Sequence, residues 1–165
     1  MGSGIHWIDL RVAGRLAIMA RPRAGDWLDD EIAGWGAAGI DIVVSLLEPA
    51  EIAELGLERE PGLCREHGME LVSFAIPDRG VPPSESQAAA LARDLAAQIA
   101  AGKAVAVHCR AGIGRSSVIA ACVMGLAGIE PQTAFDLIAA ARGTRVPDTD
   151  EQRDWVAAFA AGRAR

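Results

Sequence analysis

The sequence predicts an α/β fold, in which one domain carries a central, mostly parallel sheet flanked by helices. Short apolar runs that suit buried strands alternate with segments of helical periodicity. The chain has 165 residues, which suits a single domain with a substantial core and is short for two. We therefore expect residues 1–165 to form one domain.

The N-terminal part predicts two short strands and then a helix. Residues 7–20 alternate loosely between apolar and polar types, with a glycine in the middle that suits a turn. Asp26 suits the N-cap of a helix whose first turn is acidic, and Gly39 can end that helix. Three apolar residues recur between them at helical spacing. They are Leu28, Ile32 and Trp35.

The middle of the chain predicts two buried strands separated by short helices. Residues 40–47 and 69–76 are rich in apolar and β-branched types, which favours strands. Residues 49–55 and 61–67 each begin with proline and are followed by glycine, which favours short helices. Residues 77–83 contain too much Pro and Gly for regular structure, so we expect a loop there.

The second half predicts helices around one central strand. A capping-box pattern opens a helix over residues 84–101, and a strand follows over residues 104–107. Residues 114–126 are apolar nearly all round, so this helix should be buried in the core. Two more helices are expected over residues 131–142 and 149–161, the last one opened by a second capping box.

Composition argues against several classes of partner. The net charge of −6 disfavours general nucleic-acid binding, which needs many basic residues to neutralise phosphates. Charges interrupt every long apolar stretch, and Asp9 and Arg11 break the one near the N-terminus. We therefore expect no membrane span and no leader, hence a soluble, cytoplasmic protein. Three cysteines and three histidines at irregular spacing predict no disulfide framework, no metal and no cofactor.

The stretch of residues 105–117 has the layout of an anion-binding loop. Five residues separate Cys109 from Arg115, and two of them are glycines that permit unusual backbone angles. A strand precedes the loop and a helix follows it, so backbone N–H groups can turn inward at a helix N-terminus. A thiol held there would ionise easily. Cys109 and Asp78 each lie within two residues of a predicted strand end, so we expect them to face one crevice.

The string from His108 to Ser116 resembles the active-site signature of cysteine-dependent protein phosphatases, His-Cys-x5-Arg-Ser/Thr, at every defining position. The loop of residues 76–82 and the Thr149-x-x-Gln152 segment resemble the dual-specificity branch, which includes the kinase-associated phosphatases. The resemblance covers about residues 39–159, and it implies a catalytic core over about residues 39–160. The residues before Gly39 carry no signature of the family.

Phosphate chemistry independently calls for these residue types. A phosphate monoester is a dianion attacked by an anionic nucleophile, so the site must supply several donors and a fixed cation. Cys109 is the expected nucleophile, and the guanidinium of Arg115 is expected to bind two phosphate oxygens. The expected phosphate-binding residues are Arg110, Ala111, Gly112, Ile113, Gly114 and Arg115.

The resemblance implies roles for four further residues. It implies that His108 braces the loop, and that Asp78 protonates the leaving group and later accepts the proton of water. Ser116 would help the thiolate leave, and Gln152 would orient the water. Two of these residues have a simpler interpretation. The Pro-Asp-x-Gly sequence also suits an ordinary turn, and Gln152 also suits the capping box alone.

The other cysteines and the rival functions stay open at this point. Cys122 suits a core position, and Cys64 suits either an ordinary helix position or a disulfide with Cys109. A sulfurtransferase of the rhodanese type would have four residues between Cys and Arg, one fewer than here. A non-catalytic phosphate-binding module would be expected to lack Cys109 or Asp78. The sequence therefore favours a dual-specificity or tyrosine protein phosphatase that acts on phosphoprotein, with phosphoinositide and RNA 5′-phosphate as alternative substrates.

Overall fold

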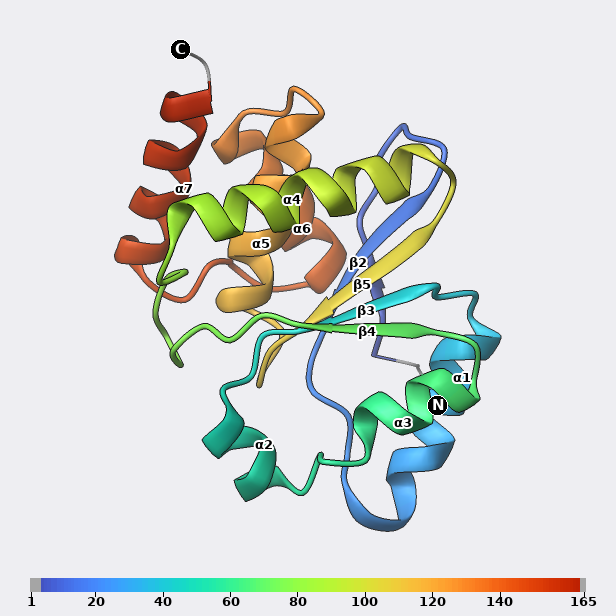
Figure 1. Ribbon diagram of the computed structural model, residues 1–165. Helices are drawn as coiled ribbons and strands as arrows, with labels where there is room; N and C mark the ends of the chain where they lie inside the picture. The colour runs from blue at the N-terminus through green and yellow to red at the C-terminus, as the bar shows by residue number, and fades with distance from the viewer. Residues whose placement is uncertain (1–3, 164–165) are drawn as a thin grey trace.

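The computed structural model describes residues 4–163 and shows a sheet with helices on both faces (Figure 1). The strands are β1 (His6–Trp7), β2 (Arg15–Met19), β3 (Ile42–Ser45), β4 (Glu70–Ser73) and β5 (Ala104–His108). The helices are the 3-10 turn η1 (Gly25–Trp27), α1 (Leu28–Ala37), α2 (Pro49–Leu55), α3 (Glu60–Glu66), α4 (Glu85–Ala100), α5 (Arg115–Leu126), α6 (Pro131–Arg142) and α7 (Asp150–Arg163). Within the described residues, no helix is long and apolar enough to cross a membrane.

The sheet has the strand order β1-β2-β5-β3-β4, and only β1 is antiparallel to its neighbour. The predicted fold class is therefore confirmed. The parallel register brings Met19 and Ser45 level with His108, so three strands end at the same edge of the sheet. Loops that leave parallel strands at this edge meet one another, and ligands bind there in such folds. The N-terminal segment supplies an inner strand, β2, which pairs directly with β5.

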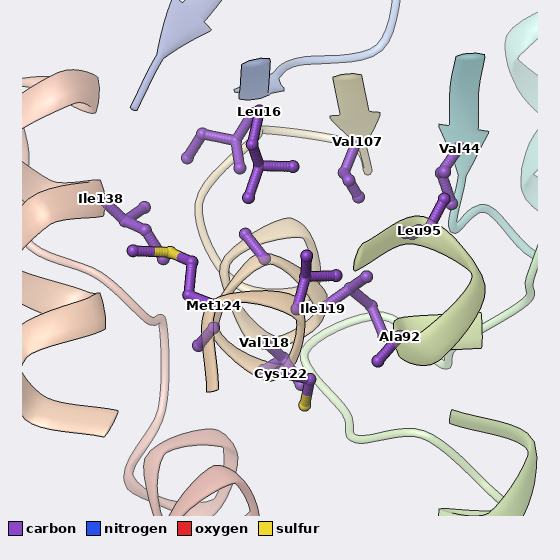
Figure 2. Packing of buried hydrophobic residues seen from close by; sticks show 14 of the residues in the cluster. Leu16, Val44, Ala92, Leu95, Val107, Val118, Ile119, Cys122, Met124 and Ile138 are labelled. Carbon is purple, nitrogen blue, oxygen red and sulfur yellow. The ribbon is translucent and has the colours of Figure 1, made fainter. Parts of the chain in front are cut away.

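The larger core lies between the sheet and helices α4 to α7. Helix α5 is buried nearly all round, as its apolar sequence predicts, and it packs against β2, β5 and the three other helices of this layer. Figure 2 shows Val118 and Ile119 of α5 among side chains from the strands and from α4. Cys122 is also buried in this cluster, in agreement with its predicted core position.

A second core covers the other face of the sheet, under α1 and α3. Trp35 of α1 and Leu63 of α3 pack there against Val43 of β3. Cys64 is fully buried in this cluster, whereas Cys109 belongs to the cluster on the opposite face. All three cysteines are free thiols, so the structure favours the ordinary helix position for Cys64.

Most predicted elements are present, but three details differ. The strands predicted over residues 40–47 and 69–76 are shorter, and at their N-terminal ends the reason is that the N–H groups of Ile40 and Met69 donate to carbonyls of the preceding helices instead of to the sheet. The capping role predicted for Asp26 is wrong. Asp26 lies inside the 3-10 turn, and the N-cap of α1 is Trp27, which makes no side-chain capping bond.

Candidate active site

The cradle loop, residues 109–115, connects the end of β5 to the start of α5. Groups outside the loop hold its carbonyl oxygens. The guanidinium of Arg142 donates to the carbonyl oxygens of Ala111 and Gly112 at 3.3 and 3.2 Å. The backbone N–H of Arg21 donates to the carbonyl oxygen of Arg110 at 3.2 Å. Because these carbonyls are drawn outward, the peptide N–H groups of the loop turn toward its centre.

The backbone N–H groups of residues 110–115 donate no hydrogen bond to any described residue. Together they form a nest of free donors at the N-terminus of a 12-residue helix, which is a favourable site for an anion. Gly112 is essential to this shape, since its φ is +72° and a Cβ would lie 2.5 Å from the carbonyl carbon of Met19. A Cβ on Gly114 would lie 2.6 Å from a carboxylate oxygen of Asp148.

The sulfur of Cys109 lies at the start of this nest. The residue is 3% exposed, and 3.4 Å separates its Sγ from Oγ of Ser116. At this distance the Ser116 hydroxyl can donate to a thiolate. The Cys109 sulfur also lies near the N-terminus of α5 and the cation of Arg115. The structure thus brings together the residues that the sequence predicted as nucleophile, cation and hydroxyl donor.

Arg115 is the most heavily engaged side chain of the site. It is 2% exposed and donates from Nη1 and Nη2 to the two carboxylate oxygens of Glu51, at 2.7 and 3.0 Å. Nη1 also donates to the carbonyl of Ile76, and Nη2 donates to Oδ1 of Asp78 at 3.2 Å. Its Nε–H has no partner among the described residues. One N–H therefore stays free for a ligand.

Buried charge pairing shifts the ionisation of both Arg115 and Glu51. Burial alone would lower the pKa of Arg115, but the hydrogen bonds and charge of Glu51 and the charges of Cys109 and Asp78 raise it. Burial alone would raise the pKa of Glu51, but hydrogen bonds from Arg115 and the backbone of Glu48 hold it below its usual value. Both groups are therefore charged near neutral pH. Nothing in the sequence signals Glu51 as a partner of Arg115, because the two residues lie 64 positions apart and Glu51 belongs to a short helix.

Asp78 sits at the tip of a tight turn and also reaches the site. The N–H of Gly80 donates to the carbonyl of Pro77 at 2.8 Å, and Arg79 has a positive φ of 60°. The predicted turn is thus present. The carboxylate nevertheless contacts Arg115 with a side chain that is 53% exposed. An exposed carboxylate beside the cradle loop has the position that a general acid requires.

Gln152 connects the start of α7 to the turn that carries Asp78. Its Oε1 accepts from the N–H groups of Asp148 and Thr149 at 3.0 and 3.2 Å, and its own N–H donates to Oγ1 of Thr149 at 3.1 Å. The predicted capping box is therefore present. Its Nε2 donates to the carbonyl of Gly80 at 3.0 Å, which leaves one amide hydrogen free beside Gly114.

Two further pairs lie next to the cradle loop. His108, which ends β5, is fully buried, with Nδ1 3.2 Å from the carbonyl oxygen of Cys109 and Nε2 2.6 Å from Oε2 of Glu60. Sequence reasoning missed Glu60, because nothing in a short helix signals a partner 48 positions away. Arg110 donates to Glu54 at 2.8 Å on the surface, so its side chain already has a counterion.

The fold and the site define a cysteine-based phosphatase of the dual-specificity type. Residues 4–159 match the family model described as "Swiss Army Knife protein, DSP-PTPase phosphatase domain", and the chain belongs to this family. The match begins well before Gly39, where the sequence resemblance was expected to start. The first residues are therefore part of the family's domain, in agreement with the inner position of β2.

Curated and solved relatives agree with this membership. The chain is 27% identical over 125 residues to cyclin-dependent kinase inhibitor 3 of Rattus norvegicus, an alignment that covers 74% of this chain and 58% of that protein. The fold is similar to that of kinase associated phosphatase with its catalytic cysteine replaced by serine, with a TM-score of 0.87, 20% identity and coverage of 97% and 95% of the two chains.

Two other solved phosphatases have the same fold. The active form of Tk-PTP has a TM-score of 0.78 and 26% identity, with 98% of this chain and 99% of that chain covered. PTPMT1 in complex with PI(5)P has a TM-score of 0.73 and 21% identity, with coverage of 98% and 99%. These structures share the architecture of the chain, and one of them is a complex with PI(5)P.

Proposed function

We propose that this protein hydrolyses phosphate monoesters of phosphoproteins, with Cys109 as the nucleophile of a phosphocysteine intermediate. One observation carries the proposal. The N–H groups of residues 110–115, which have no partner within the described part of the chain, directly follow a buried thiol, and the cation of Arg115 lies beside it. A ring of donors of this kind suits the three non-bridging oxygens of a phosphoryl group.

Substrate binding rearranges one ion pair. Planar guanidinium groups bind phosphate through two parallel N–H donors. In Arg115 the free Nε–H is one such donor, and the second is the Nη2–H that now contacts Asp78. Phosphate therefore displaces Asp78 from Arg115, while Glu51 keeps the guanidinium in place from the other side. The released carboxyl group becomes available to the leaving oxygen.

Chemistry then proceeds in two displacements. The thiolate of Cys109 attacks phosphorus, so an S–P bond forms while the P–O bond to the substrate breaks, and the protonated carboxyl of Asp78 donates its proton to the leaving oxygen. Water next attacks the phosphocysteine, Asp78 accepts one of its protons, and the S–P bond breaks. Ser116 donates to the departing thiolate, and the free amide hydrogen of Gln152 is available to hold the water.

The rim of the site supports phosphoprotein as the substrate. A multiply phosphorylated lipid or RNA 5′ end carries several negative charges, which free basic side chains would recognise. Arg110, the basic residue at the surface of the cradle loop, is paired with Glu54 instead. The similarity to a kinase associated phosphatase points in the same direction, whereas that to PTPMT1 bound to PI(5)P supports a lipid substrate. A panel of phosphotyrosyl and phosphoseryl peptides, phosphoinositides and 5′-phosphorylated RNA separates these substrates.

The test of the proposed activity is hydrolysis of para-nitrophenyl phosphate. We expect Cys109→Ser to abolish turnover nearly completely, and Asp78→Ala to lower kcat by about 10²–10⁴. Asp94→Ala, which removes an exposed carboxylate from α4, serves as the control and should match wild type. An Asp78→Ala enzyme as fast as wild type would refute the acid role. Transfer of sulfur from thiosulfate without phosphatase activity would refute the proposed reaction.

A further inference from the structure

Arg79 has a strained backbone next to the proposed general acid. Its φ is +60°, and within residues 4–163 every other residue with a positive φ is a glycine. The hydrogen bond from Gly80 to Pro77 closes the turn, and Arg79 is the third residue of that turn, a position that glycine and asparagine usually take. Such strain collects at functional sites. The chain therefore carries a guanidinium where the backbone disfavours any side chain of this kind.

The guanidinium of Arg79 is available to a ligand. The residue is exposed, and its side chain has no hydrogen bond or ion pair with any residue in the described part of the chain. In the cradle loop, by contrast, Arg110 donates to Glu54, and Arg115 is held by two carboxylates. Arg79 is thus a cation beside the site that lacks a counterion.

Two contacts fix the turn of Arg79 at the edge of the site. Asp78 reaches Arg115 at 3.2 Å on one side, and Nε2 of Gln152 donates to the carbonyl of Gly80 at 3.0 Å on the other. The backbone of Arg79 lies between these two contacts. A substrate residue that flanks the phosphorylated one therefore passes close to this turn.

An acidic substrate residue needs a local cation at this place. The carboxylate of Asp78 is close, and a carboxylate oxygen of Asp148 lies 2.6 Å from the point where a Cβ on Gly114 would be. The whole chain is also acidic, with a net charge of −6. These charges repel a second anion unless a cation offsets them. In the proposed reacting state Asp78 is protonated, so Arg79 has no counterion on its own turn.

We infer that Arg79 is a specificity-determining residue of the phosphatase site, which favours phosphopeptides with an acidic residue close to the phosphorylated one. One guanidinium binds one carboxylate through two parallel N–H donors. It therefore suits a single acidic side chain better than the several phosphates of a polyphosphorylated lipid or RNA end. The inference rests on the proposed function, because it concerns the choice of substrate for that reaction.

The test is kcat/KM for matched phosphotyrosyl and phosphoseryl peptides in wild type, Arg79→Gly and Arg93→Ala. In each pair one peptide carries a single Asp near the phosphorylated residue, and the other carries Asn there. We expect wild type to prefer the best Asp peptide about five-fold at low salt, the upper end for an exposed charge pair, and less at high salt. Arg79→Gly should show a ratio of one or less, and glycine suits the turn, so this variant should fold as well as wild type.

The control, Arg93→Ala, removes an exposed arginine from α4 and should keep the wild-type ratio. Because the ratio compares two peptides in one enzyme, a general effect on the loop of Asp78 cancels. An unchanged ratio in Arg79→Gly, with an equal fall for both peptides and for para-nitrophenyl phosphate, overturns the inference and makes Arg79 a support for the acid. Loss of phosphoinositide turnover in Arg79→Gly with an unchanged peptide ratio overturns it as well.

Binding to Cys109→Ser separates this inference from the proposed function. Calorimetry should show tighter binding of the Asp peptide than of the Asn peptide, and no difference after Arg79→Gly is added. If wild type hydrolyses no substrate but this difference in binding is found, the proposed function falls and the role of Arg79 stands. If wild type hydrolyses phosphopeptides without preference for Asp, the inference falls and the proposed function stands.

Discussion

Replacing Glu51 with glutamine tests how the cation of the site is held. Glu51 accepts two hydrogen bonds from Arg115, whose side chain is 2% exposed, and the side chain of Glu51 is itself 10% exposed. Removing one partner of a buried ion pair destabilises a protein by about 3–5 kcal/mol, since the other charge stays buried. Glutamine retains one acceptor oxygen, so we expect a loss of about 2–4 kcal/mol for Glu51→Gln at pH 7.

The stability lost in Glu51→Gln should become smaller as the pH falls. Hydrogen bonds from Arg115 outweigh burial and hold the pKa of Glu51 below its usual value. The stabilisation is therefore fully present above the unfolded pKa of about 4.3 and is lost as the pH falls through the lower folded pKa. The difference in unfolding free energy between wild type and Glu51→Gln should be constant above about pH 5 and shrink below it.

Thermal and urea denaturation measure this difference. The expected loss corresponds to a fall in Tm of about 5–15 °C for a chain of this size. The control is Glu54→Gln on the same helix, which removes the exposed partner of Arg110 and should change stability by less than about 0.5 kcal/mol. A Glu51→Gln variant as stable as wild type at pH 7 would show that the pair does not hold Arg115 in place.

Three further predictions follow from the same contacts. Gly112→Ala should lose phosphate binding in calorimetry and about 1–3 kcal/mol of stability, whereas Gly102→Ala, with a positive φ but open space, should lose stability alone. Arg142→Ala should raise the KM of para-nitrophenyl phosphate about ten-fold by loosening the cradle loop, and an unchanged KM contradicts this. Burial raises the pKa of the other two thiols to about 12, so iodoacetamide should modify Cys109 in native protein and spare them, as mass spectrometry can show.

The elements that the sequence predicted best are those with local signals. Pro49 and Gly56 bound α2, and Pro131 and Gly143 bound α6, so the predicted limits of both helices agree with the structure. The strand limits were less accurate, because a buried apolar residue such as Ile40, whose N–H donates to Trp35 of the preceding helix, looks the same in sequence as one that joins the ladder. Hydrogen bonding between strands is a long-range property that apolar periodicity does not report.

The same distinction applies to the candidate site. The cradle loop is contiguous in sequence, so the residue types and spacing of Cys109 and Arg115 were enough to predict it. Glu51 and Glu60 belong to the site only through the fold, which brings two short helices under the loop. A carboxylate in the first turn of a helix is ordinary in sequence, because the helix dipole already favours it there. Such residues need a structure to be found.

The central claim, that Cys109 carries the phosphoryl group, is tested most directly by trapping the intermediate. Wild-type protein is mixed with para-nitrophenyl phosphate, quenched in acid before the first turnover ends, digested and analysed by mass spectrometry. We predict one added phosphoryl group on the peptide that contains Cys109, and none on the same peptide from Cys109→Ser. Turnover by wild type without a phosphoryl group on this cysteine would contradict the account.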